Sequence, residues 1–293
     1  MAVSYQVAES TRLNRRQQKL WSIAYLPQKP RAVLVWHHGV GESNDRAKYK
    51  TFFDAFAKNG IAVYAQDAHG MGKSEPSNSA DRVFVRSVDH LVDDAEEFAT
   101  AARGQHPEGV PCFVGGVSMG GMISTLLALR QQQAWKGLLL QSAAINVEKN
   151  FVQRITEALA GILNVLVPRA RIVPAVPAEY LSKDPQVRKE TMDDPYTVVG
   201  NMKVATGTMF LHGFAQIAQT GSTLSLPIFA IHGTEDKVTS PKAVRALLDG
   251  CASKDKVFVP VEGGYHELIM GAGTAEATQH HVDWLLKHLP ATT

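Results

Sequence analysis

The chain has 293 residues, of which 45% are hydrophobic and 20% are charged, and its formal net charge is +2. These values are typical of globular proteins, so they exclude a disordered chain and a coiled coil and allow one large core with an insertion. Basic residues are scattered except for Arg15, Arg16 and Lys19, so no nucleic-acid partner is expected.

Short apolar runs alternate along the chain with helix-length segments, which is typical of a mostly parallel sheet with helices on both faces. The predicted strands cover residues 32–36, 61–65, 112–114, 137–141, 227–231 and 257–261. The predicted helices cover residues 47–58, 88–102, 123–129 and 274–289. The sequence therefore predicts the α/β fold class.

This alternation disappears between residues 142 and 225, a stretch with helical segments, five prolines and no clear strand. We interpret it as a helical cap, here called the cap segment. It is inserted into a core that consists of residues 1–141 and 226–293.

Six apolar residues of the cap segment fall on one face of a predicted helix that Pro168 ends. They are Phe151, Ile155, Leu159, Ile162, Leu163 and Leu166. Such a stripe commonly packs against its own domain. Because Val165 and Val167 widen it beyond one contact surface, it is also suited to contact with lipid. Both interpretations can hold in an enzyme that takes an acyl chain from a membrane.

The segment Gly116-Val117-Ser118-Met119-Gly120 lies between a predicted strand and a predicted helix, which makes it a candidate nucleophile elbow. In such an elbow the serine occupies a strained turn, so the residues two before and two after it must be small. Gly116 and Gly120 meet this demand. Chance is the alternative in a chain with 23 glycines, so a serine hydrolase needs further support from an acid, a base and an oxyanion hole.

An acid and a base follow later strands in the required chain order. Asp236 comes after the strand at 227–231, where it would hold the imidazole in the right tautomer, although spacing leaves Glu235 as a competitor. His266 comes after the strand at 257–261, on a loop that can bring an imidazole over Ser118. It is the predicted base, which would accept the serine proton during attack.

The loop at residues 37–41 follows the strand at 32–36 and corresponds to the loop that donates one oxyanion-hole amide in this architecture. Val40 is the predicted donor from this loop. The amide of Met119, directly after the candidate nucleophile, is the predicted second donor. His38 is expected to fix the loop rather than to take part in catalysis.

Other motif-like residues are assigned structural roles. Gly72-Lys73-Ser74 matches the end of a phosphate-binding loop, but Asp67 stands where that loop needs its first glycine, so residues 67–74 are predicted to form a structural turn. His232 is also expected to be structural. Three histidines of the last helix are predicted to lie at the surface: His280, His281 and His288.

Taken together, these segments resemble the monoacylglycerol lipase family of α/β-hydrolases. The segments that carry the resemblance are 38–42 (His-Gly-x-Gly-Glu), 116–121 (Gly-x-Ser-Met-Gly-Gly), 232–236 (His-Gly-x-x-Asp) and the late histidine in 265–268. A further segment, 67–74, departs from the family pattern because Met71 replaces a histidine.

The resemblance implies an α/β-hydrolase fold with a cap and assigns the site residues. Ser118 is the nucleophile, Asp236 rather than Glu235 the acid, and His266 the base, and the amides of Val40 and Met119 form the oxyanion hole. The implied reaction is hydrolysis of a monoacylglycerol through an acyl-enzyme, without a metal or organic cofactor. The implied partner is a lipid ester, with peripheral contact to a membrane or lipid droplet through the cap segment.

Two rival functions remain. The first is a carboxylesterase or lysophospholipase with the same triad, because fold and triad do not determine the leaving alcohol. The second is a non-catalytic hydrolase-fold protein that binds a ligand. The chain starts without a basic region followed by an apolar core, and no apolar run reaches the ~18 residues of a membrane span, so a cytoplasmic protein is expected.

Overall fold

The computed structural model describes residues 3–78, 80–146, 160–174, 176–198 and 200–290. Within these residues one eight-stranded sheet has the order β1-β2-β4-β3-β5-β6-β7-β8. The strands are β1 Tyr5–Leu13, β2 Lys19–Pro27, β3 Ala32–His37, β4 Ile61–Gln66, β5 Cys112–Val117, β6 Gly137–Gln141, β7 Ile228–Gly233 and β8 Lys256–Val261. From β4 to β8 all neighbours are parallel, whereas β1–β2 and β2–β4 are antiparallel. The predicted α/β architecture is confirmed.

The hairpin of β1 and β2 is absent from the sequence-based prediction. β1 is an edge strand whose side chains are mostly exposed, so it contains no buried apolar run. β2 is mostly buried and mostly apolar, and it pairs with β1 in a nine-residue register from Tyr5↔Pro27 to Leu13↔Lys19. The exposed β1 offered no apolar run, whereas the apolar residues 23–26 of β2 were a usable signal for a strand.

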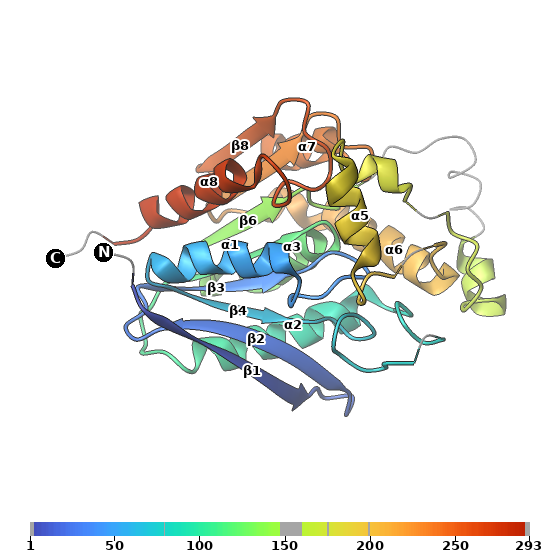
Figure 1. Ribbon diagram of the computed structural model, residues 1–293, viewed down its shortest axis with the longest axis horizontal. Coiled ribbons are helices and arrows are strands. Elements are labelled where there is room, and N and C mark those ends of the chain that lie inside the picture. Colours follow the sequence, from blue (N-terminus) through green and yellow to red (C-terminus); the bar gives the residue numbers. More distant parts are fainter. Residues whose placement is uncertain (1–2, 79, 147–159, 175, 199, 291–293) are drawn as a thin grey trace.

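Helices cover both faces of the sheet (Figure 1). They are α1 Ala47–Lys58, α2 Val88–Arg103, α3 Met119–Arg130, α5 Pro185–Asp193, α6 Val204–Thr220, α7 Pro241–Gly250 and α8 Thr274–Lys287. Successive β3 residues point to opposite faces: Leu34 packs in a core with α1 and α8, and Val35 packs in a core with α2, α3 and α6. The fully buried central strands therefore hold their carboxyl ends in fixed positions.

His281 on α8 is buried, so its predicted surface position is wrong. Its Nδ1 lies 2.7 Å from the carbonyl of Ala277, and its ring packs edge-on against Phe52 at 5.2 Å. Burial lowers the pKa of His281 to about 4, so the ring is neutral at pH 7. His281 lies one helical turn after Ala277 and one before Leu285. This spacing places it on the apolar face of α8, which could have predicted its burial.

The cap segment contains α5, α6 and two short 3₁₀ turns, Ala178–Tyr180 and Gly221–Thr223. Figure 1 shows α5 beyond the carboxyl ends of the parallel strands, while β1 begins and α8 ends at the opposite end of the molecule. α6 shares the hydrophobic core of α2 and α3, so the later part of the cap segment packs closely against the sheet domain. The division into cap and core stays a prediction.

Half of the predicted apolar stripe, Phe151, Ile155 and Leu159, lies outside the described residues. In the described half, Ile162 and Leu166 are 60% and 70% exposed, and the neighbouring Val165 is 80% exposed. These three side chains are largely exposed and do not pack into the sheet domain, whereas Leu163, the remaining described member of the stripe, is partly buried. Among the described residues, no helix is both long enough and apolar enough to cross a membrane.

Candidate active site

Ser118 occupies the turn between β5 and α3 with φ 55° and ψ −119°, a strained combination for a residue with a side chain. Its N–H donates to the carbonyl of Gln141 at 3.1 Å, and its carbonyl accepts the N–H of Ala144 at 2.9 Å. The strained backbone is thus fixed by the end of β6. This is the predicted nucleophile elbow in geometry.

The two glycines of the elbow are required by close backbone contacts. A Cβ on Gly116 would lie 2.5 Å from the backbone of Gly120, and a Cβ on Gly120 would lie 2.0 Å from the carbonyl oxygen of His37. Neither contact is possible without moving the main chain. The elbow therefore sits directly against the end of β3.

Asp236 and His266 are hydrogen-bonded at the carboxyl ends of β7 and β8. His266 Nδ1–H donates to Asp236 Oδ2 at 2.8 Å, and both side chains are buried. The other oxygen, Oδ1, accepts the backbone N–H groups of Val238 and Thr239 at 2.7 and 3.0 Å. Glu235 instead is half exposed and pairs with Lys183 at 3.2 Å, so it is not the partner of His266.

Opposed effects set the pKa values of this pair. Burial alone would raise the pKa of Asp236, but the charge of His266 and hydrogen bonds from His232 and His266 hold it well below its ordinary range. Burial would lower the pKa of His266, but the charge and hydrogen bond of Asp236 outweigh this and raise it above 6.5. A carboxylate that stays ionised and a strengthened imidazole base suit proton transfer.

His232 is a second imidazole on the same carboxylate. It is fully buried, and its Nε2–H donates to Asp236 Oδ2 at 3.0 Å. This contact accords with its predicted structural role.

Ser142 and Thr239 connect the elements of the site, and the sequence analysis did not identify either. Ser142 Oγ donates to the carbonyl of His266 at 2.8 Å, and Thr239 Oγ1 lies 3.0 Å from the carbonyl of Ser142 and 2.8 Å from Asp236 Oδ2. Ser142 directly follows β6, which also fixes Ser118. No hydrogen bond joins Ser118 Oγ to His266 among the described residues. Ser142 could have been identified from the sequence, because it directly follows the predicted strand next to the elbow.

The loop after β3 lies against the elbow, as predicted for an oxyanion loop. A Cβ on Gly39 would be 3.5 Å from the Cβ of Ser118. The amide of Val40 makes no hydrogen bond to another described residue. Met119 is the first residue of α3, so its N–H has no acceptor within the helix. Both amides are thus available to a developing oxyanion next to Ser118, and their role stays a prediction.

His38 fixes this loop, as expected. Its Nε2 accepts the N–H of Ala68 at 2.9 Å, and its Nδ1–H lies 2.6 Å from the carbonyl of Gly39.

The turn at residues 67–74 is structural, as predicted. Asp67 points into it and accepts the N–H of Lys73 at 2.8 Å, and a Cβ on Gly72 would lie 1.9 Å from Asp67 Oδ2. The carboxylate therefore occupies the inside of this turn.

A family model described as serine aminopeptidase, S33 (Hydrolase_4) matches residues 28–272. The chain belongs to this family. Among individual proteins, it is 28% identical over 260 residues to a monoacylglycerol lipase from Mycolicibacterium smegmatis, which covers 89% of this chain and 90% of the relative. It is 25% identical over 261 residues to caffeoylshikimate esterase from Arabidopsis thaliana, which covers 86% of this chain and 76% of the relative.

The fold is also that of a solved member of the lipase group. A soluble variant of monoglyceride lipase from Saccharomyces cerevisiae, in complex with a substrate analogue, superposes with a TM-score of 0.82 at 20% identity, covering 99% of this chain and 97% of that one. At this identity the likeness supports the α/β-hydrolase fold. In the part of the chain that the structure describes, no group of three or more His, Cys, Asp or Glu side chains is placed to hold a metal ion.

The elbow contacts predict that Gly120→Ala abolishes labelling of Ser118 by a fluorophosphonate, because the new methyl group would strike the carbonyl of His37 and displace the turn. The matched control is Gly250→Ala at the end of α7, where an added Cβ has open space. Labelling should be followed by intact-protein mass spectrometry. Normal labelling of Gly120→Ala would contradict the structural account of the elbow.

The raised pKa of His266 predicts the pH dependence of ester hydrolysis. The base must be neutral to accept a proton, so kcat/KM should fall as the pH is lowered through an apparent pKa above 6.5. Asp236→Asn removes the charge that raises this pKa, so the apparent pKa should decrease, and kcat should fall on the order of 10⁴-fold. A pH–rate profile of both proteins checks this. An acidic limb that does not move would exclude Asp236 as the partner of His266 in catalysis.

Proposed function

We propose that the protein is a serine hydrolase that cleaves monoacylglycerols into a fatty acid and glycerol. The observation that carries the proposal is the strained, buried Ser118 at the elbow. It lies at the same carboxyl end of the parallel strands as the hydrogen-bonded Asp236–His266 pair. The substrate class is supported by the monoacylglycerol lipase from Mycolicibacterium smegmatis, which matches over most of both chains.

The proposed reaction proceeds through an acyl-enzyme. Ser118 Oγ attacks the ester carbonyl while His266 Nε2 takes its proton, and the carbonyl electron pair moves onto the oxygen. When the tetrahedral intermediate collapses, the bond to glycerol breaks and His266 returns the proton to the leaving oxygen. Water, activated by the same imidazole, then attacks the acyl-enzyme and releases the fatty acid.

The amides of Val40 and Met119 would stabilise the oxyanion in both steps. Such a donor typically contributes about 3 kcal/mol to the transition state, because it is fixed before charge develops. The close approach of Gly120 to the carbonyl of His37 and the hydrogen bond from Gly39 N–H to Glu42 support this rigidity. Asp236 would stabilise the imidazolium, which forms in a buried site where an unpaired charge would be costly.

An esterase acting on another alcohol is the second candidate. It is favoured by the similarity to caffeoylshikimate esterase, which matches over 86% of this chain with nearly the same identity as the lipase relatives. The same serine chemistry serves both, and the acyl and alcohol pockets decide between them.

The test of the proposal is fatty-acid release from monoacylglycerols, lysophospholipids and short p-nitrophenyl esters by the wild type and by Ser118→Ala. We expect preference for monoacylglycerols and complete loss in the variant, with the fold retained by circular dichroism. Activity confined to short esters would support the esterase instead. Absence of both turnover and fluorophosphonate labelling in the wild type would favour a ligand-binding protein.

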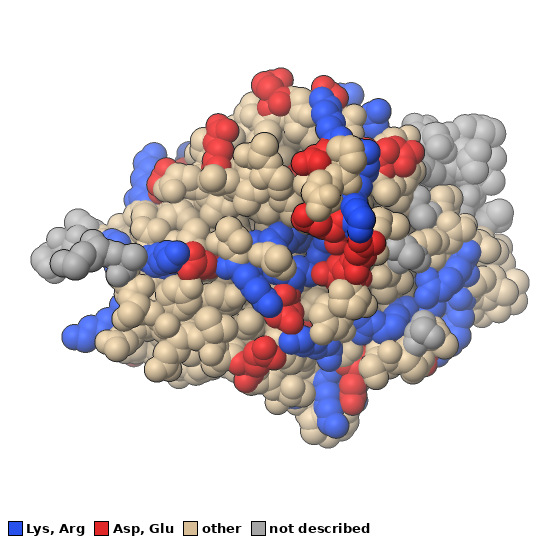
Figure 2. All heavy atoms as spheres, viewed as in Figure 1, with Lys and Arg blue, Asp and Glu red and all other residues tan. Residues whose placement is uncertain are grey.

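We further propose that the cap segment contacts a lipid surface. Its described residues include six exposed apolar side chains, Ile162, Val165, Leu166, Val167, Ile172 and Val176. Exposed cations lie in the same stretch: they are Arg169 and Arg171, and Arg169 packs on the ring of Phe84 at 4.2 Å. Figure 2 shows Lys and Arg side chains gathered at the right-hand end of the molecule, on the cap side. Apolar residues flanked by cations suit the surface of an anionic bilayer.

For this contact, we expect the double variant Ile162→Ser, Leu166→Ser to bind phosphatidylcholine–phosphatidylglycerol vesicles at least about 10-fold more weakly, because burial of each such side chain contributes about 1.5 kcal/mol or more. The matched control is Val7→Ser, Leu13→Ser on the edge strand β1, where both residues are 52% exposed. Co-sedimentation measures the partition. Equal weakening by both pairs, or by neither, would contradict docking through the cap segment.

A further inference from the structure

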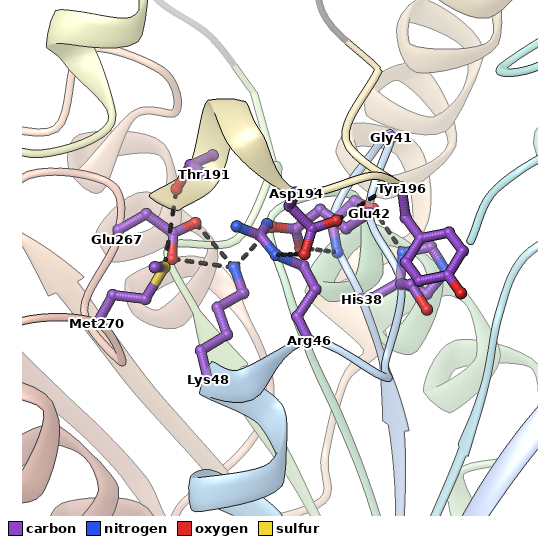
Figure 3. Close-up of polar contacts among 12 residues, drawn as sticks. His38, Gly41, Glu42, Arg46, Lys48, Thr191, Asp194, Tyr196, Glu267 and Met270 are labelled. Carbon is purple, nitrogen blue, oxygen red and sulfur yellow. Dashed lines mark hydrogen bonds and ion pairs between the residues drawn. The ribbon is translucent and has the colours of Figure 1, made fainter. Parts of the chain in front are cut away.

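A cluster of buried charged side chains lies beside the candidate active site and is not used by the proposed reaction (Figure 3). Its members come from the loop after β3, from the start of α1, from the cap segment and from the loop after β8. They are Glu42, Arg46, Lys48, Asp194 and Glu267, and their side chains are between 1% and 17% exposed. Burial of five charges is costly, so the cluster calls for an explanation.

Lys48 is the centre of this cluster. Its ammonium donates to Glu42 Oε1 at 2.6 Å and to both carboxylate oxygens of Glu267 at 2.9 Å, and its side chain is only 1% exposed. Lysine has three donors on one nitrogen, and here all three point to carboxylate oxygens. The ammonium therefore binds two segments that are 225 residues apart in sequence, from Glu42 to Glu267.

Glu42 connects Lys48 to the oxyanion loop. Its other carboxylate oxygen, Oε2, accepts the N–H of Gly39 at 3.1 Å and the hydroxyl of Tyr49 at 2.6 Å. Gly39 stands against Ser118 and directly precedes Val40, the proposed oxyanion donor. A shift of Glu42 would thus move the amide that faces the reacting oxygen.

Glu267 connects Lys48 to the base, because it directly follows His266. Its backbone N–H donates to the carbonyl of Leu181 in the cap segment at 2.9 Å. With its side chain held by Lys48 and its backbone held by the cap segment, Glu267 has little freedom to move. Because His266 directly precedes Glu267 in the chain, the fixed Glu267 also limits where the His266 imidazole can lie.

A second branch of the cluster reaches the cap segment through Arg46. Its guanidinium pairs with Glu42 at 2.5 Å and with Asp194 at 3.3 Å. Asp194 accepts the N–H of Tyr196 at 2.9 Å, and Val198 N–H donates to the carbonyl of Gly41 at 3.1 Å. Figure 3 shows these side chains in one row from Glu267 to Tyr196. The cap segment is thereby joined to the oxyanion loop next to Val40.

We propose that Lys48 is a positioning residue that joins the loop after β3 to the loop after β8, which carries His266. In this way it holds the Val40 amide and the His266 imidazole in place around Ser118. This rests on the proposed function for its catalytic meaning. A well-packed apolar side chain would fill the same space at a lower desolvation cost, so stability alone does not account for a buried lysine. A bridge between two catalytic loops does, because small displacements of preorganised groups slow a reaction strongly.

The first test compares Lys48→Met and Glu267→Met with Lys58→Met. Lys58 lies at the other end of α1 and pairs with the partly exposed Asp54, far from the cluster, so it is a matched control. Glu267→Met is the second variant in case Lys48→Met fails to fold. It leaves Lys48 paired with Glu42, and it leaves two carboxylates and two cations in the cluster. We expect kcat to fall by about 10-fold to 100-fold in both cluster variants, with KM little changed.

Charge effects on His266 must be separated from its position. Besides Asp236, whose carboxylate also contacts the ring of His232, the charged groups near this imidazole are Glu267, which raises its pKa, and Lys48, which lowers it. Lys48→Met should therefore move the acidic limb of the pH–rate profile up, and Glu267→Met should move it down. On the alkaline plateau free His266 is neutral in every variant. Charge effects on the imidazolium formed during attack act in opposite directions in the two variants, whereas a displaced group lowers kcat in both. Wild-type kcat on the plateau for both variants would overturn the proposal.

A spectroscopic readout tests the same inference without turnover. The Nδ1 proton of His266, hydrogen-bonded to Asp236, should give a low-field NMR signal that is protected from exchange in the wild type and in Lys58→Met. Faster exchange of this proton in Lys48→Met and Glu267→Met supports the bridge, and an unchanged exchange rate contradicts it. If the wild type hydrolyses no ester, the proposed function fails, and this signal still decides whether Lys48 positions the imidazole.

Discussion

The contact between the elbow and the end of β3 is the constraint on which the rest of the site depends. Because the main chain of Gly120 touches the carbonyl of His37, the strand ends of β3 and β5 are held at a fixed distance. The loop that continues from β3 must then pass beside Ser118, and α3 must start with its free amides facing the same space. Parallel strand order brings Asp236 and His266 to the same carboxyl end of the sheet from the other side.

Buried polar groups in the site are matched by partners, and this matching is what makes their burial tolerable. The carboxylate of Asp236 accepts hydrogen bonds from two imidazoles, a hydroxyl and two backbone amides. Its negative charge is therefore stable at a depth where water cannot reach it, and it can hold His266 in one tautomer. The charge cluster around Lys48 follows the same principle on a larger scale, with alternating signs along one row.

The sequence was sufficient to predict those strands and turns whose residue pattern reflects contacts made by the same residues. Continuous apolar runs identified all six strands from β3 to β8, and the glycines around Ser118 identified the elbow, because each pattern reflects contacts made at that place. Tertiary contacts without such a pattern were missed. Lys48 and Glu267 look like ordinary surface charges in sequence, and their pairing depends on a fold that brings α1 beside the loop after β8. The edge strand β1 was missed because its side chains are mostly exposed, whereas β2 contains a buried run that the prediction passed over.

The placement of the chain ends relative to the cap segment has a practical consequence. β1 starts and α8 finishes at one end of the molecule, and α5 and α6 lie at the other (Figure 1). A fusion partner or surface tether attached at either terminus would therefore orient the protein with its apolar cap residues facing outward. Immobilised in this way, the protein could approach a bilayer or an emulsion droplet without its anchor standing between the cap and the lipid.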